Sequence, residues 1–206
     1  DVPELWEINY SDNPPPGFSG WEHSYHEESG DLVKSEPFPR LRILVDTHLD
    51  DFFFNQEYDL LLGASREGKG MVVSLDVKRV IETLDLPGMP HLGSGITWEY
   101  QGRQVMATPN LKEGVVSIID MENWQTIKRI ETLGPGFFMR SHNNSPYAWV
   151  DVFFGPDRDA VHVIDKQSLE IVKTLRPAPG KTAAHVEFTR DGKYALLSIW
   201  DMDGAL

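Results

Sequence analysis

The sequence predicts an all-β chain that is part of a β-propeller, and two observations lead to this prediction. A hydrophobic residue followed by aspartate recurs as Leu75-Asp76, Ile119-Asp120 and Ile164-Asp165, at spacings of 44 and 45 residues. Short apolar runs separated by turn residues fill these intervals, and no segment shows a sustained period of 3.6 residues. A repeat near 44 residues with several short strands is typical of a propeller blade.

The individual strands are expected in chain order. Residues 4–10 alternate apolar and polar side chains, as a strand with one buried face does. The breaker-rich sequence that follows predicts an extended loop between blades over residues 11–40. Beyond it, strands are expected at 42–45, 58–63, 70–75, 79–84, 96–100, 104–107, 115–119, 125–130, 148–152, 160–164, 170–175, 185–188 and 194–198. Turn sequences such as Lys112-Glu113-Gly114 and Arg190-Asp191-Gly192-Lys193 separate them.

The size and composition describe a globular piece of a larger propeller. The chain has 206 residues, which is enough to bury a sizeable core, and it starts without an initiator methionine or a signal sequence. Four to five units of about 44 residues fill this length, whereas closed propellers commonly have about four to eight blades. We therefore expect residues 1–206 to be a fragment of a single propeller domain.

Charge and cysteine content exclude several functions. The net charge is −13, from 32 acidic and 19 basic residues, which argues against nucleic acid or an anionic membrane surface as partner. No apolar stretch is long enough to span a bilayer. The chain has no cysteine, so disulfides, iron–sulfur ligation and covalent c-type haem attachment are excluded within it.

Four histidines recur with the repeat: His48, His91, His142 and His185, spaced 43, 51 and 43 residues apart. Equivalent positions of successive blades lie at the same height around one axis. We therefore expect these histidines at one end of the channel, where imidazoles can form a pocket for a flat iron macrocycle. The alternative is that each histidine only caps a strand. His91 and His185 are the strongest candidates, followed by His48 and then His142.

The surroundings of these histidines also favour ligand binding. His91 lies in a loop with two prolines and three glycines, where the backbone can approach a ligand closely. Ala183 and Ala184 leave room beside His185. A macrocycle that carries carboxylates also needs arginines, and Arg66 and Arg140 are the best placed. The alternative for both arginines is a role in solubility.

Three segments resemble a known family. Met89–Gly95, Gly63–Arg66 and Ala184–Trp200 are similar to the haem d1-binding propeller of cytochrome cd1 nitrite reductase and its relatives, over essentially the whole chain. The resemblance implies about half of an eight-bladed propeller with four-stranded antiparallel blades. It also implies haem d1 or dihydro-haem d1 with its iron as cofactor, a role in denitrification and a periplasmic location. His48 and His91 match the two histidines that donate protons to nitrite.

Other positions depart from the reductase and resemble its paralogues in haem d1 biosynthesis. These positions are Asp51–Phe54, Leu92–Gly95 and His185. The resemblance to the dihydro-haem d1 dehydrogenase implies His91 as an iron ligand. It implies His185 as the proton acceptor when a propionate side chain becomes an acrylate.

Several further expectations follow from this resemblance. Any c-type haem and the second axial ligand would lie upstream of this chain. A c-type cytochrome and the nitrite reductase are candidate protein partners. A nitrite reductase and a non-enzymatic carrier of the tetrapyrrole remain the alternative functions.

Overall fold

The computed structural model describes residues 3–8, 23–25, 32–35, 40–201 and 204–205. Strands make up the regular structure of these residues, together with one short 3-10 turn, η1 (Leu92–Ser94), and no α-helix occurs among them. The predicted all-β class is confirmed. Within the same described residues, no helix is long and apolar enough to cross a membrane.

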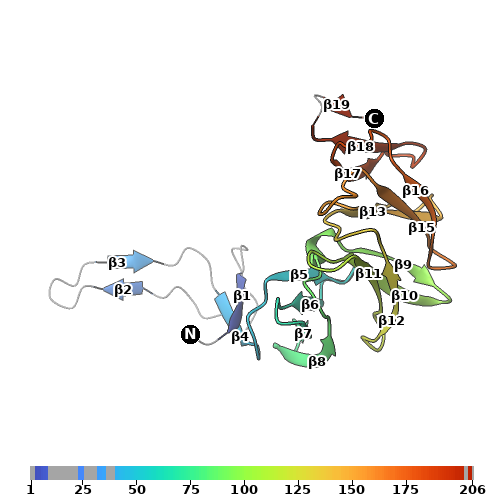
Figure 1. The fold of residues 1–206 in the computed structure, drawn as a ribbon. Helices are drawn as coiled ribbons and strands as arrows, with labels where there is room; N and C mark the ends of the chain where they lie inside the picture. The colour runs from blue at the N-terminus through green and yellow to red at the C-terminus, as the bar shows by residue number, and fades with distance from the viewer. Residues whose placement is uncertain (1–2, 9–22, 26–31, 36–39, 202–203, 206) are drawn as a thin grey trace.

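Three complete four-stranded sheets form the centre of the chain (Figure 1). The first consists of β5 (Asp51–Phe54), β6 (Leu60–Ala64), β7 (Lys69–Ser74) and β8 (Arg79–Asp85). The second consists of β9 (Ile96–Tyr100), β10 (Arg103–Pro109), β11 (Val115–Asp120) and β12 (Thr126–Glu131). The third consists of β13 (Met139–Ser141), β14 (Tyr147–Asp151), β15 (Val161–Asp165) and β16 (Glu170–Leu175).

Partial sheets lie on both sides of the complete ones. β1 (Glu4–Ile8) pairs with β4 (Arg40–Leu44) before the first complete sheet. β17 (Ala183–Phe188), β18 (Ala195–Ile199) and β19 (Gly204–Ala205) follow the third. Every sheet is antiparallel, and its strands are in sequence order. Figure 1 shows the sheets following one another in an arc from teal to red. These are propeller blades, as the repeat predicts.

The repeat is visible in local detail. The pairing of third and fourth strands shifts register at the same place in each complete sheet, between Val72/Val73, Ile118/Ile119 and Val163/Ile164. The recurring aspartates lie at the ends of strands or in the turns that follow them, where their side chains can accept nearby backbone N–H groups. Asp120 accepts the backbone N–H of Glu122 at 2.8 Å, and Asp165 accepts that of Gln167 at 2.9 Å.

The hydrophobic core lies between sheets that pack face to face. One cluster joins the second and third sheets through residues such as Val116, Ile118, Met139 and Val150, which are all fully buried. A second cluster joins the first and second sheets through Leu62, Val72, Met106 and Ile119 among others. Each sheet therefore depends on its neighbours to bury its apolar surface.

Three predictions about secondary structure need correction. β5 and β13 lie where no strand is predicted, because three consecutive phenylalanines and a three-residue segment show no alternation. Residues 11–40 are predicted as an extended loop between blades. The structure has a hairpin there, formed by β2 (His23–Tyr25) and β3 (Leu32–Ser35), and the stretch joins β1 and β4, which pair with each other. Its remaining residues lie outside the described part.

The number of strands per blade determines which residues meet. Because each complete sheet is a four-stranded meander, its first and third strands begin at one edge, and its second and fourth strands end there. We call the side of the sheets where the first strands begin the starting edge, and the side where the first strands end the opposite edge. The starting edge brings together the segments before β5, β9 and β13 and those after β6, β10 and β14.

We predict that Ile118→Ala lowers the free energy of unfolding by about 2–5 kcal/mol, because Ile118 is fully buried between the second and third sheets. Ile127→Ala in the same sheet is the matched control. Its side chain is 37 % exposed, so the loss is about 1 kcal/mol or less. Urea denaturation of both variants measures the difference. Equal losses would contradict the assignment of the core.

Candidate functional site

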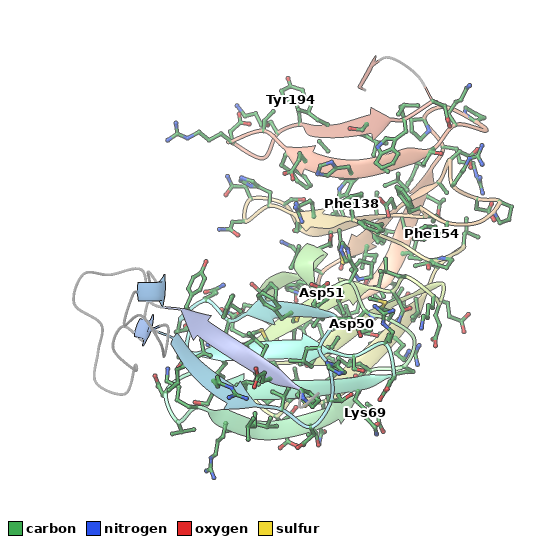
Figure 2. All side chains as sticks on the ribbon, turned by 90° about the vertical axis from the view of Figure 1, so that its left-hand side faces the viewer. Asp50, Asp51, Lys69, Phe138, Phe154 and Tyr194 are labelled. Carbon is green, nitrogen blue, oxygen red and sulfur yellow. The ribbon has the colours of Figure 1, made fainter. Side chains whose placement is uncertain are left out.

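The starting edge brings two of the predicted histidines to one phenylalanine. The ring of His185 stacks on Phe138 with centroids 4.6 Å apart and planes at 24°, and the ring of His91 lies 6.3 Å from Phe138. Figure 2 labels Phe138 and Phe154, which flank β13 and β14 of the third complete sheet, and Asp50 and Asp51 at the start of β5 in the first. Residues from the second blade, the third blade and the last partial blade thus meet in one site.

His91 is held with one ring nitrogen engaged and the other available. Its backbone N–H donates to the carbonyl of Pro109 at 2.9 Å. Its Nδ1 lies 2.5 Å from the carbonyl oxygen of Phe137. A carbonyl only accepts, so Nδ1 carries the proton and Nε2 keeps its lone pair. This is the tautomer that a histidine needs to bind a metal through Nε2.

Two side chains from neighbouring strands hold the loop around His91. Asn110, which is 1 % exposed, accepts the N–H of Met89 at 3.2 Å and donates to the carbonyl of Pro87 at 2.8 Å. On the other side, Asp51 accepts the N–H of Gly93 at 2.9 Å. The loop is therefore anchored before and after the histidine.

His185 occupies a β-bulge. The register of β17 and β18 shifts between Ala184 and Val186, so His185 has no partner on β18, and its φ is +61°. A residue with a side chain rarely adopts this backbone conformation, which is strained unless the surroundings hold it. The side chain is 46 % exposed, and its Nε2 lies 3.9 Å from Oε1 of Glu187. The bulge thus presents an accessible imidazole beside Phe138.

A buried carboxylate joins these elements. Asp151, at the end of β14, is fully buried and accepts the N–H groups of Phe137 at 2.7 Å, Phe138 at 3.1 Å and His185 at 3.4 Å. Burial raises the pKa of Asp151 to about 6, because it disfavours the charged form, while the three N–H bonds act in the opposite direction.

An aromatic surface extends from the two histidines. It consists of Phe137, Phe138, Phe153, Phe154 and Trp200. Phe153 is central, with ring centroids 5.2 Å from Phe137, 4.8 Å from Phe154 and 5.0 Å from Trp200. Phe154 and Trp200 remain 39 % and 57 % exposed. Sequence reasoning missed this surface and Asp151. The signal for the surface was two pairs of adjacent phenylalanines, Phe137-Phe138 before β13 and Phe153-Phe154 after β14.

His48 and Arg66 also lie at the starting edge, at the first complete sheet. Arg66 pairs with Asp50 through Nη2 at 2.5 Å and Nε at 2.7 Å, and its backbone N–H donates to the same carboxylate at 2.7 Å. These bonds lower the pKa of Asp50. His48 is exposed, and among the described residues it makes no hydrogen bond or ring contact with His91 or His185.

Arg140 lies on β13 and reaches the site through a carboxylate. Its Nε donates to Oε1 of Glu187 at 2.9 Å, the oxygen that faces His185. Both predicted arginines therefore already have a carboxylate partner within the chain.

His142 lies elsewhere, and the expectation of one common end is wrong for it. It follows β13, a strand of only three residues that carries the chain to the opposite edge. There Nδ1 accepts the N–H of Asn144 at 3.0 Å, and Nε2 lies 3.3 Å from the carbonyl of Arg190. Both ring nitrogens are engaged between two turns. The longer interval of 51 residues before His142 is the signal of this displacement.

The opposite edge holds a polar cleft without the histidine pair. It has a volume of about 530 Å³, and its lining includes Trp98, Glu99, Gln104 and Lys166. The Nζ of Lys166 donates to the carbonyl of His142 at 3.3 Å, and burial lowers the pKa of this lysine. Among the described residues, no group of three or more His, Cys, Asp or Glu side chains is arranged to hold a metal ion.

We predict that stability conferred by Asp151 falls as the pH rises. Folding raises its pKa from the ordinary 3.8 to about 6, so the folded state binds the proton more tightly than the unfolded state. The associated stability is fully present below pH 4 and is lost as the pH passes 6. The free energy of unfolding of wild type relative to Asp151→Asn should fall by up to about 3 kcal/mol between pH 4 and pH 7. Urea denaturation across this range measures it, and a rising difference would contradict the shift.

We also predict that His185→Gly is more stable than His185→Ala, with a free energy of unfolding about 1 kcal/mol higher, because glycine adopts a positive φ without strain. Glu187 provides the control on the same strand, since it lies in regular β17 pairing opposite Leu196. There the alanine variant should be the more stable of the two. The same order at both positions would show that the bulge carries no strain.

Comparison with known proteins identifies the family. The family model described as "Cytochrome D1 heme domain" matches residues 31–206. The dihydro-heme d1 dehydrogenase of Pseudomonas aeruginosa is 51 % identical over 207 residues, which cover 100 % of this chain and 38 % of that protein. Protein NirF of Stutzerimonas stutzeri is 34 % identical over 98 % of this chain and 48 % of its own length. This chain therefore spans less than half the length of both curated relatives.

Solved structures agree with this assignment. The dihydro-heme d1 dehydrogenase NirN in complex with DHE matches with a TM-score of 0.75 and 53 % identity, over 87 % of this chain and 37 % of that chain. Hydrazine synthase of Kuenenia stuttgartiensis, at 14 % identity and a TM-score of 0.57 over 84 % of this chain and 47 % of its own, shares the fold alone. The chain therefore belongs to the cytochrome d1 haem domain family.

Proposed function

We propose that this protein binds dihydro-haem d1 at the starting edge and oxidises it to haem d1, so that one propionate side chain becomes an acrylate. The observation that supports this most directly is the placement of His91 and His185 around Phe138. His91 has a free Nε2 for iron, and His185 is an accessible base that stacks on the same phenylalanine. Relatives named for this activity and for a complex with DHE support the choice of substrate.

The residues present fit a planar iron macrocycle. His91 offers one neutral nitrogen, which is what a haem iron takes from one side. The aromatic surface offers apolar rings on which a flat conjugated ring system can lie. His91 alone would hold the iron from this chain, since the macrocycle would bring its own nitrogen ligands. When bound, the iron macrocycle supplies a conjugated system that can lose electrons from its edge.

His185 is the proposed proton acceptor. Oxidation of the propionate removes one hydrogen from each of two neighbouring carbons, in total two protons and two electrons. The exposed imidazole of His185 takes up one proton, and Glu187 beside it stabilises the cation that forms. The other proton goes to solvent, and the two electrons pass to an acceptor outside this chain. We propose a c-type haem or c-type cytochrome as this acceptor.

The two predicted arginines are not free to bind the carboxylates of the substrate directly. Arg66 and Arg140 are already paired with Asp50 and Glu187. A substrate carboxylate would share or replace these partners. At Arg140 such a replacement would also release Glu187 toward His185. His48 would face the substrate from the side of the first sheet.

The remaining proposals concern the whole protein. We propose a periplasmic location and delivery of the product to nitrite reductase, as the family resemblance of the sequence implies. A non-enzymatic carrier would use the same His91 and aromatic surface without a base. The exposed imidazole held in a strained bulge favours the enzyme, because strain of this kind concentrates at functional sites.

We predict that His185→Ala slows conversion of dihydro-haem d1 by about 100-fold or more, and leaves binding nearly unchanged, because the base is lost but His91 remains. The full-length protein is loaded with dihydro-haem d1 and an electron acceptor, and the visible spectrum reports formation of haem d1. His142→Ala is the control and should convert at the wild-type rate.

Two outcomes would overturn the proposal in different ways. If wild type binds dihydro-haem d1 but never converts it, the protein is a carrier. If the haem d1-loaded protein turns over nitrite, and His48→Ala reduces this turnover, the protein is a reductase. A protein that binds no d1-type haem at all would contradict binding as well as catalysis.

A further inference from the structure

A continuous set of hydrogen bonds connects the two histidines of the site. It starts at His91, whose Nδ1–H donates to the carbonyl of Phe137 at 2.5 Å. That carbonyl belongs to the same peptide group as the N–H of Phe138, which donates to Oδ1 of Asp151 at 3.1 Å. One rigid, planar peptide group therefore contacts His91 on one side and Asp151 on the other.

The other oxygen of the carboxylate continues to the second histidine. Oδ2 of Asp151 accepts the backbone N–H of His185 at 3.4 Å, at the bulge of β17. Asp151 itself belongs to β14, and its N–H donates to the carbonyl of Phe138 at 3.2 Å. The carboxylate thus spans from the third blade to the last partial blade, and each of its two oxygens serves one histidine.

The environment of Asp151 is unfavourable for a charged side chain. Its side chain is fully buried, and among the described residues no lysine or arginine forms an ion pair with it. A buried carboxyl without a cationic partner destabilises a protein unless hydrogen bonds compensate. Here the hydrogen bonds that compensate come from the backbone N–H groups of Phe137, Phe138 and His185. A group of this kind is expected where it contributes to a site.

We propose that Asp151 is the positioning residue that sets His91 and His185 in a defined relation to each other. For the reaction, this inference rests on the proposed function of the two histidines. Because its side chain is fully buried, Asp151 would act through neighbouring groups and not by touching the substrate or the iron. It orients the Phe137–Phe138 peptide group, which selects the ring nitrogen of His91 that carries the proton, and it holds the backbone of His185 in the bulge.

Only a side chain with two acceptor oxygens suits this position. Three N–H groups converge on the carboxylate, two on Oδ1 and one on Oδ2. Asparagine has almost the same shape but one oxygen. Its amide NH2 must face either the N–H groups of Phe137 and Phe138 or the N–H of His185, and either contact is repulsive. Asp151→Asn therefore releases one end of the connection with little change in volume.

Asp120→Asn is the matched control. Asp120 is also a fully buried aspartate at the end of a strand, and it accepts hydrogen bonds from Nη1 of Arg103 at 2.5 Å and from the N–H of Glu122 at 2.8 Å. It lies at the opposite edge of the second sheet. Its replacement destabilises the fold through a comparable loss of buried bonds, but it has no connection with the histidines.

The first measurement needs no bound haem. The full-length protein is labelled with ¹⁵N-histidine, and the ring ¹⁵N shifts of His91 report which nitrogen carries the proton. Wild type and Asp120→Asn should show the Nδ1–H tautomer. Asp151→Asn should show a mixture of both tautomers, together with about 10-fold or faster hydrogen exchange at the amide of Phe138 or of His185.

The second measurement is the conversion of dihydro-haem d1 by the same variants. Asp151→Asn should lower kcat by about 10-fold or more with a smaller effect on KM, and Asp120→Asn should change neither by more than about twofold. An unchanged His91 tautomer in Asp151→Asn would overturn the proposal. So would an altered tautomer with unchanged kcat. If wild type shows no conversion, the proposed function fails, and the tautomer and exchange data still decide whether Asp151 positions the two histidines.

Discussion

Face-to-face packing of neighbouring sheets is the constraint on which the rest of this structure depends. The buried clusters lie between sheets, so a blade reaches its stable form only beside the next one. Four antiparallel strands per blade then return every first strand to the same edge. Together these two conditions bring His91 and His185, which are distant in sequence, to the same phenylalanine ring. The site is a consequence of stacking before it is a consequence of any single side chain.

Much of this arrangement follows from the sequence, because the repeat and the turn residues are local signals. They predict the all-β class and most strands, and the residues around the histidines rank His91 and His185 highest. The wrong or missing parts depend on contacts between blades. β13 is only three residues long and is recognisable through its pairing with β14. His142 lies at the opposite edge, because it follows the three-residue strand β13 and is held between two turns.

Asp151 illustrates what local patterns cannot reveal. In the sequence it interrupts an apolar run between Val150 and Val152, inside a predicted strand, and no local pattern shows which groups it meets. Its partners come from the segment before β13 and from the bulge in β17, and both converge on it only in the folded chain. The arginines show the same limit. Their charge is visible in the sequence, but their engagement with Asp50 and Glu187 depends on folding.

The bulge at His185 has a consequence for how such sites can diversify. A residue without a cross-strand partner can be exchanged while the ladder on either side keeps its register, because Ala184 and Val186 retain their partners Ser198 and Leu197. The chemical group offered to a bound ligand is thus uncoupled from the architecture that presents it. A single substitution at this position can interchange a reactive and an inert surface on an otherwise identical scaffold.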